Sequence, residues 1–205
     1  MVERAFDEYA AARRDTVGIA APLTQAQLDF CPRYGRWSIG EVLHHLMLAE
    51  DLYRGEIGRL IDLARAGQRP YIRRSFSEVN VAPFFVPDAV LPMFDVPFSL
   101  LNRFIPQSVR DFAIEYPFVP IRNPSVSTPR AGRAAAELRG ELVLSLEQTR
   151  VLLVSNADLA FERMVSEHPL MGPANVPQIL AFLARHERRH HSQIERVKTD
   201  GRFPR

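Results

Sequence analysis

The feature that most constrains this chain is a pair of histidines, His186 and His190, in a segment with helical periodicity. Residues i and i+4 of an α-helix lie one above the other, with Cβ atoms about 5 to 6 Å apart, so both imidazoles can reach one metal ion. At 100° per residue the same stripe also contains Ile179, Phe182, Leu183, Gln193 and Val197. The two imidazoles therefore occupy core positions of a predicted helix.

The string His-Glu-Arg-Arg-His over residues 186–190 also matches the H-E-x-x-H pattern of zinc metalloproteases, in which Glu187 would be the general base. The extended pattern requires Gly and His where this chain has Gln193 and Arg196. No glutamate follows Glu195 to act as a downstream ligand. A third metal ligand must therefore come from an upstream part of the chain.

Four segments carry helical periodicity, and no strand pattern of comparable length competes with them. They cover about residues 3–17, 39–66, 129–153 and 177–198. Ser38 and Glu41 form a capping box that starts the second helix, and Gly67 is placed to end it. Thr128 as N-cap and Pro129 as first helical residue are expected to start the third. We predict an all-α fold, a four-helix bundle.

The connection between the second and third helices, at about residues 68–128, has an unusual composition. It contains nine of the sixteen prolines and eight of the thirteen phenylalanines. This density of proline excludes a long regular helix, and the apolar content is too high for a disordered linker. We predict one domain, residues 1–205, in which this segment is an irregular Pro/Phe-rich crossover packed on the bundle.

The second helix offers the third ligand. Its apolar stripe is centred near Leu46, which leaves His45 about 100° away at the stripe's edge and His44 about 160° away, on the solvent side. We predict that His45 joins His186 and His190, because buried imidazoles need partners and one divalent cation satisfies all three. The alternative for His45 is a hydrogen-bonded core residue.

Four further residues are candidates for supporting the site. Gln193 shares the stripe of the two histidines, and His191 lies about 100° from His190. Glu50 falls about 40° from Leu46, inside an apolar stripe, where a carboxylate needs a partner. Glu50 and Glu187 are the candidate general bases, and a plain ion pair is the alternative for Glu50. His44, His168 and His191 are expected at the surface or behind the ligands.

Three segments resemble the DinB/YfiT-like superfamily of metal-binding four-helix bundles. They are Trp-Ser-Ile-Gly-Glu-Val-Leu-His-His-Leu over residues 37–46 and His-x-x-x-His-His-x-Gln-Ile over residues 186–194, together with His-Pro-Leu-Met-Gly over residues 168–172. The resemblance spans nearly the whole chain. It implies a metal triad of one histidine from the second helix and two from the fourth, which here are His45, His186 and His190. It also implies relatives that include thiol-dependent S-transferases and a thiol-dependent maleylpyruvate isomerase.

Three neutral histidines with an open coordination position are typical of a catalytic Zn²⁺ or Ni²⁺ site. A water or a small thiol could fill the open position and become a nucleophile. We therefore expect a metal-dependent enzyme acting on a small molecule, a thiol S-transferase or a hydrolase, with a low-molecular-weight thiol among its substrates. The alternative is a non-catalytic, metal-binding, dimerising stress-associated protein.

Composition excludes several other classes. Cys31 is the single cysteine, so a thiolate-rich metal site and an intramolecular disulfide are both excluded. A net charge of +2, from 26 basic and 24 acidic residues, is too balanced to predict nucleic-acid binding. No apolar run approaches the ~18 residues of a membrane span, and the N-terminus lacks a signal-peptide pattern. We expect a cytoplasmic protein with a small-molecule substrate, and a homodimer is one assembly open to it.

Overall fold

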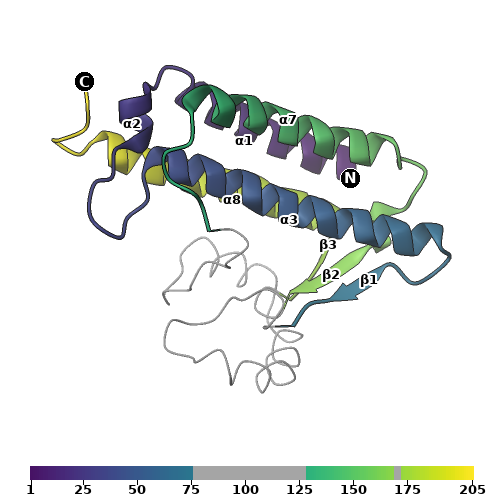
Figure 1. Cartoon of the computed structure of the whole chain (residues 1–205). Coiled ribbons are helices and arrows are strands. Elements are labelled where there is room, and N and C mark those ends of the chain that lie inside the picture. The colour runs from purple at the N-terminus through teal and green to yellow at the C-terminus, as the bar shows by residue number, and fades with distance from the viewer. Residues whose placement is uncertain (76–127, 169–171) are drawn as a thin grey trace.

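The fold rests on four long helices, α1 (Val2–Ala20), α3 (Ile39–Arg65), α7 (Ala135–Val154) and α8 (Val176–Lys198). The structure is a computed structural model, and it describes residues 1–75, 128–168 and 172–205. Helix α1 packs against α8 and α7, and α3 packs against α7 and α8, as Figure 1 shows. A short helix, α2 (Gln25–Asp29), precedes α3. The prediction of a mainly helical fold is confirmed.

Capping explains why α3 and α8 begin where they do. The Ser38 hydroxyl accepts a hydrogen bond from the Glu41 backbone N–H at 3.2 Å, and the Glu41 carboxylate accepts one from the Ser38 N–H at 2.9 Å. Asn175 and Gln178 form the equivalent box at the start of α8. These reciprocal bonds satisfy backbone donors that have no partner inside the helix. The predicted start of α3 is confirmed.

The predicted start of the third helix was wrong. Helix α7 begins at Ala135 rather than at Pro129, because Gly132 adopts a left-handed backbone with a φ of +71° that a helix cannot continue through. Its N-cap residue, Ala134, has no side chain that could accept a hydrogen bond. The Ala135 N–H instead donates to the side-chain oxygen of Gln25 in α2 at 2.8 Å. Residues 128–134 are therefore a non-helical approach to α7.

This approach segment also corrects the expectation that His44 faces solvent. His44 is buried, and its Nδ1 accepts a hydrogen bond from the Arg130 backbone N–H at 2.8 Å. Burial and the nearby Arg133 guanidinium lower the pKa of His44. Helical periodicity alone missed this contact because the covering chain is distant in sequence and not helical.

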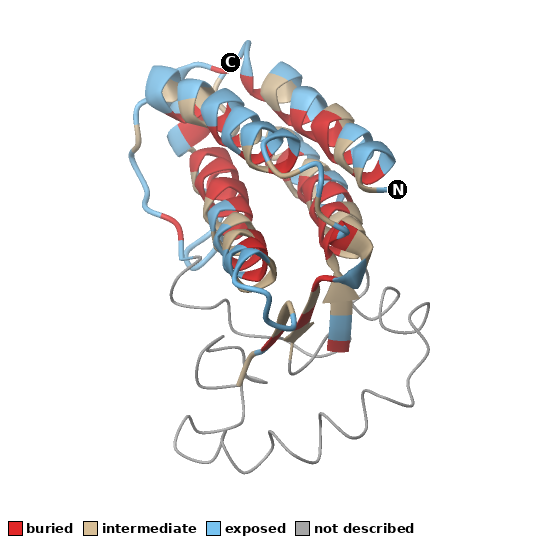
Figure 2. Cartoon of the chain, turned by 90° about the vertical axis from the view of Figure 1, so that its right-hand side faces the viewer, coloured by how far each residue is buried: buried red, intermediate tan, exposed pale blue. Residues whose placement is uncertain are grey.

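Buried residues lie on the faces that the helices turn toward one another, as the colouring of Figure 2 shows. The apolar ones form two clusters. The first joins the N-terminal half of α1, the C-terminal half of α3 and the N-terminal half of α8. The second joins α2, the N-terminal half of α3, the first half of α7 and the C-terminal half of α8. Buried polar residues of these helices include Arg13, His45, Glu50, Thr149 and Glu187.

A small sheet, absent from the sequence prediction, lies beside these helices. Its strands are β1 (Tyr71–Arg73), β2 (Val165–His168) and β3 (Gly172–Asn175), in the order β1-β2-β3. Strand β1 is parallel to β2, and β2 is antiparallel to β3. Strands of three and four residues are too short to show the alternation by which a strand is recognised in sequence. The predicted crossover falls mostly on residues 76–127, outside the described residues.

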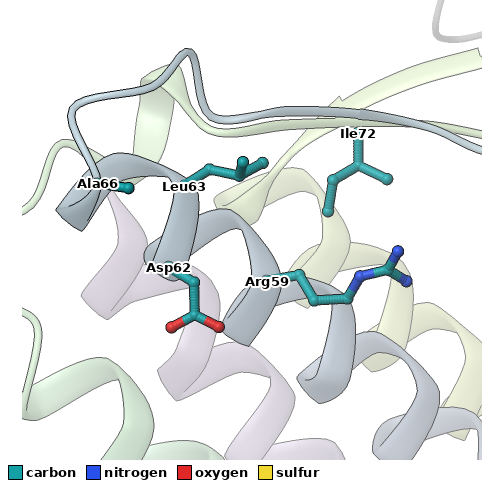
Figure 3. Close-up of a pocket in the computed structure, with 5 residues that line it drawn as sticks. All are labelled: Arg59, Asp62, Leu63, Ala66 and Ile72. Atoms are coloured by element: carbon teal, nitrogen blue, oxygen red, sulfur yellow. The ribbon is translucent and has the colours of Figure 1, made fainter.

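A pocket of about 350 Å³ lies between the last turns of α3 and strand β1 (Figure 3). Its lining consists of Arg59, Asp62, Leu63, Ala66 and Ile72. Arg59 is fourteen residues beyond His45 on α3, about 20 Å along the helix axis, so this pocket is separate from the histidines. Within the described ranges, no helix combines the length and apolar character that a membrane span requires.

Candidate metal centre

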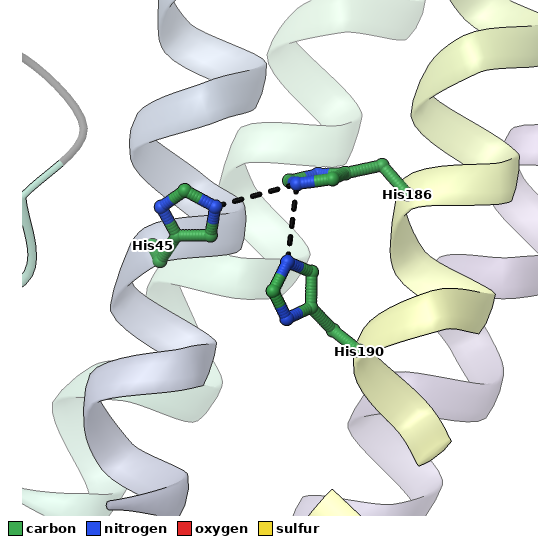
Figure 4. A group of neighbouring side chains, drawn as sticks. All are labelled: His45, His186 and His190. Atoms are coloured by element: carbon green, nitrogen blue, oxygen red, sulfur yellow. Dashed lines mark hydrogen bonds between the residues drawn. The ribbon is translucent and has the colours of Figure 1, made fainter. Parts of the chain in front are cut away.

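Three histidines converge between α3 and α8 (Figure 4). The Nε2 atom of His186 lies 3.3 Å from Nε2 of His45 and 3.1 Å from Nε2 of His190. One ring nitrogen from each residue lies within 4.8 Å of the others, and among the described residues this is the group of such ligands that could hold a metal ion. The structure therefore brings together the three predicted residues, one from α3 and two from α8.

Neighbouring side chains orient two of these rings. Nδ1 of His190 lies 2.9 Å from Oε1 of Gln193, one turn along α8. Because a carbonyl oxygen only accepts hydrogen bonds, this contact places the proton on Nδ1 and leaves the Nε2 lone pair directed at the other histidines. The ring of His186 stacks on Phe182 at 5.6 Å between centroids and 14° between planes. Gln193, predicted to support the site, thus lies within hydrogen-bonding distance of His190.

The electrostatic environment keeps the imidazoles of α8 neutral. Burial lowers the pKa of His186 well below its usual value, and the neighbouring His190 and His45 lower it further. Burial and the nearby His45 lower the pKa of His190 to about 3, although the bond to Gln193 acts in the opposite direction. Neutral imidazole is the form that coordinates a metal, so neither ring needs to lose a proton first at neutral pH.

Trp37 adds an aromatic wall beside His45. Its ring lies 4.8 Å from the His45 ring, and the side chain is only half-buried at the start of α3. The sequence marks this residue only as part of the motif that leads into α3. Trp37 precedes the N-cap Ser38, so its contact with His45 depends on the non-helical chain that leads into α3.

Glu187 and Glu50, the two candidate general bases, point into a buried ion-pair network. Arg13 of α1 lies between them, with Nη2 at 2.6 Å from Oε1 of Glu187 and Nη1 at 3.0 Å from Oε2 of Glu50. All three side chains are almost completely inaccessible to solvent. Burial alone would lower the pKa of Arg13, but Glu187, Tyr9 and Glu50 more than offset it and raise the pKa.

The remaining hydrogen-bonding capacity of the two carboxylates is also used. Ser145 and Thr149 of α7 donate to Glu50 at 2.6 and 2.7 Å. Thr16 of α1 donates to Glu187, and its hydroxyl lies 2.7 Å from Nε2 of His191. His191, expected at the surface or behind the ligands, is therefore half-buried in this network rather than at the metal centre. The network joins all four long helices.

Comparison with known proteins identifies the family. The family model of the DinB superfamily matches residues 8–194. The chain belongs to the DinB superfamily. No curated protein and no solved structure matches it. Members of the DinB superfamily typically bind metal, and the matched range contains all three converging histidines.

The residue pattern pointed to the histidines but not to the role of Arg13. Its signal was present in the sequence, because Arg13 interrupts the apolar stripe of the first helix while Glu50 interrupts that of the second. Two opposite charges at core positions of different helices need each other. This reasoning predicts the ion pair between Arg13 and Glu50 but not the one between Arg13 and Glu187.

Replacement of Arg13 by methionine should lower the free energy of unfolding by about 3–5 kcal/mol, because it removes the cation that bridges two buried carboxylates. Urea denaturation of the metal-free protein measures this loss. Arg4→Met is the matched control, since Arg4 forms an exposed ion pair with Glu8 on the same helix. That control should change stability by less than about 1 kcal/mol. Equal effects of the two substitutions would contradict the assigned importance of the network.

Proposed function

We propose that His45, His186 and His190 bind one divalent cation. The separations of their Nε2 atoms carry this proposal. Nitrogen ligands at ~2.0–2.1 Å from a tetrahedral metal lie about 3.3 Å from one another, and His186 Nε2 lies 3.3 and 3.1 Å from the Nε2 atoms of His45 and His190. A single proton on His186 Nε2 could serve only one of its two neighbours, whereas a cation serves all three nitrogens.

Zn²⁺ and Ni²⁺ suit this set of donors best. Neutral imidazole is a ligand of intermediate softness that both ions accept, and there is no thiolate or carboxylate in the described group. Three protein ligands leave a coordination position for a reactant, as in catalytic zinc sites. A bound cation would supply Lewis acidity there, lowering the pKa of a water or thiol that enters the position.

The surroundings of the triad favour thiol transfer over hydrolysis. Hydrolysis benefits from a carboxylate that can act as general base, but Glu187 and Glu50 are held in the network of Arg13. Transfer of a thiol needs no general base from the protein, because a bound metal would itself lower the pKa of the thiol. The half-buried rings of Trp37 and Phe182 beside His45 and His186 would give a small organic substrate an apolar contact. We therefore infer a metal-dependent S-transferase acting on a small electrophile and a low-molecular-weight thiol.

Metal analysis tests the site. The purified protein, loaded with Zn²⁺ or Ni²⁺ and freed of excess by gel filtration, should retain about one ion per chain. Each of His45→Ala, His186→Ala and His190→Ala should lose it, because two imidazoles hold a divalent cation far more weakly than three. Elemental analysis by mass spectrometry gives the stoichiometry.

His44→Ala is the matched control for these variants. It removes the imidazole next to His45 in the sequence, whose nitrogen bonds to the Arg130 backbone instead. This variant should keep its metal. Retention of a full equivalent by any of the three triad variants would remove that histidine from the site.

Gln193→Ala should weaken metal binding by roughly 10- to 100-fold, because His190 loses the partner that fixes its tautomer and ring orientation. Gln193→Glu is the conservative control, since a carboxylate oxygen accepts the same bond from Nδ1. Competition with a chromogenic chelator measures both affinities. Equal affinities for the alanine variant and the natural protein would show that Gln193 does not support the site.

The reaction class is tested with chlorodinitrobenzene and a small thiol such as cysteine. In this transfer the sulfur–carbon bond forms, the carbon–chlorine bond breaks, chloride leaves and the thiol proton passes to solvent. Turnover that needs metal and His45 supports the S-transferase. Thiol-independent cleavage of a nitrophenyl ester would replace it with a hydrolase. A metal-loaded protein inactive in both assays would favour the non-catalytic, metal-binding alternative.

A further inference from the structure

Helix α7 carries apolar residues on both sides. Its buried side chains, from Leu138 to Leu153, face the other helices. On the opposite side, four large apolar residues are about half or more exposed: Val143 at 55%, Leu144 at 56%, Val151 at 49% and Val154 at 62%. At 100° per residue these four lie within an arc of about 100°, so they form one stripe along the helix. A helix that is apolar all round is usually covered on every side.

A charged pair lies in the middle of this α7 stripe. The Arg150 guanidinium donates two hydrogen bonds to the Glu147 carboxylate, at 2.8 and 2.6 Å, and both side chains are about half exposed. No other charged residue lies between Val143 and Val154. The stripe therefore presents apolar ends and a centre that holds one charge of each sign.

This arrangement is self-complementary. The midpoint between Glu147 and Arg150 is also the midpoint between Val143 and Val154. When two copies of α7 are laid antiparallel about a two-fold axis through that midpoint, each Glu147 faces Arg150 of the partner subunit. Each Val143 then faces Val154 of the partner subunit. An interface on a two-fold axis requires this matching of a surface with itself.

We propose that the α7 stripe is a homodimer interface, formed by antiparallel pairing of α7 with α7 of a second chain. The apolar residues supply the attraction, and the two Glu147–Arg150 pairs set direction and register. The bonds between Glu147 and Arg150 within one helix are no obstacle, because an exposed ion pair contributes little and exchanges readily for one across the interface. Helix α7 provides none of the three converging histidines, so the pairing leaves the metal centre untouched.

Charge reversal tests this register. The natural protein at tens of micromolar should sediment with twice its chain mass of 23.3 kDa. Glu147→Arg alone places an arginine at position 147 opposite Arg150 of the partner subunit, twice in the dimer. Arg150→Glu alone places two glutamates opposite each other in the same way. Each variant should therefore dimerise at least about tenfold more weakly. Mixing the two variants in equal amounts should restore dimers, because both pairs then regain opposite charges.

Two further variants complete the test. Val143→Glu should weaken dimerisation, because it places a carboxylate against Val154 of the partner subunit twice. Glu8→Arg reverses a similarly exposed charge on α1, where it pairs with Arg4, and should leave the dimer unchanged. Circular dichroism confirms that every variant is folded.

Three results would overturn the proposal. The first is a monomeric natural protein, in which the stripe is covered by the chain itself or by a different partner. The second is a dimer that resists the two charge reversals and Val143→Glu. The third is dimerisation that both charge reversals abolish but mixing them does not restore, which would require a different register or orientation of the two helices.

Discussion

The ion pair between Arg13 and Glu187 determines how α8 is rotated about its own axis. Glu187 lies between His186 and His190 in the sequence and about 100° from His186 around the helix. With Glu187 held against α1, the two histidines are turned toward α3, where His45 lies. The geometry of the triad therefore depends on a charge interaction that involves none of its members.

The buried network around Arg13 lies between the helices and keeps them in register. Apolar packing specifies a helix pair loosely, since neighbouring side chains of similar volume can exchange places. Arg13 has five donors in a fixed plane, and here they are directed at Glu187, Glu50, Tyr9 and a backbone carbonyl of α7. Sliding any helix by one turn would break several of these bonds in a buried setting, so the network selects one arrangement.

Local signals in the sequence predicted the parts that local interactions determine. The capping box at Ser38 and the spacing of His186 and His190 predicted two helices and the convergence of three histidines. The start of α7, the burial of His44 and the sheet were missed because they depend on contacts between distant segments, such as Arg130 with His44. The direction of Glu187 was missed for the same reason, since the H-E-x-x-H pattern says nothing about a cation on another helix.

The spacing of residues 186–190 limits how this part of the sequence can change during evolution. Within five residues α8 presents two imidazoles to one neighbour and a carboxylate to another. Loss or gain of a single residue between them would swing one histidine by about 100° and carry Glu187 away from its cation. The tract can thus change by exchange of side chains but not by change of length.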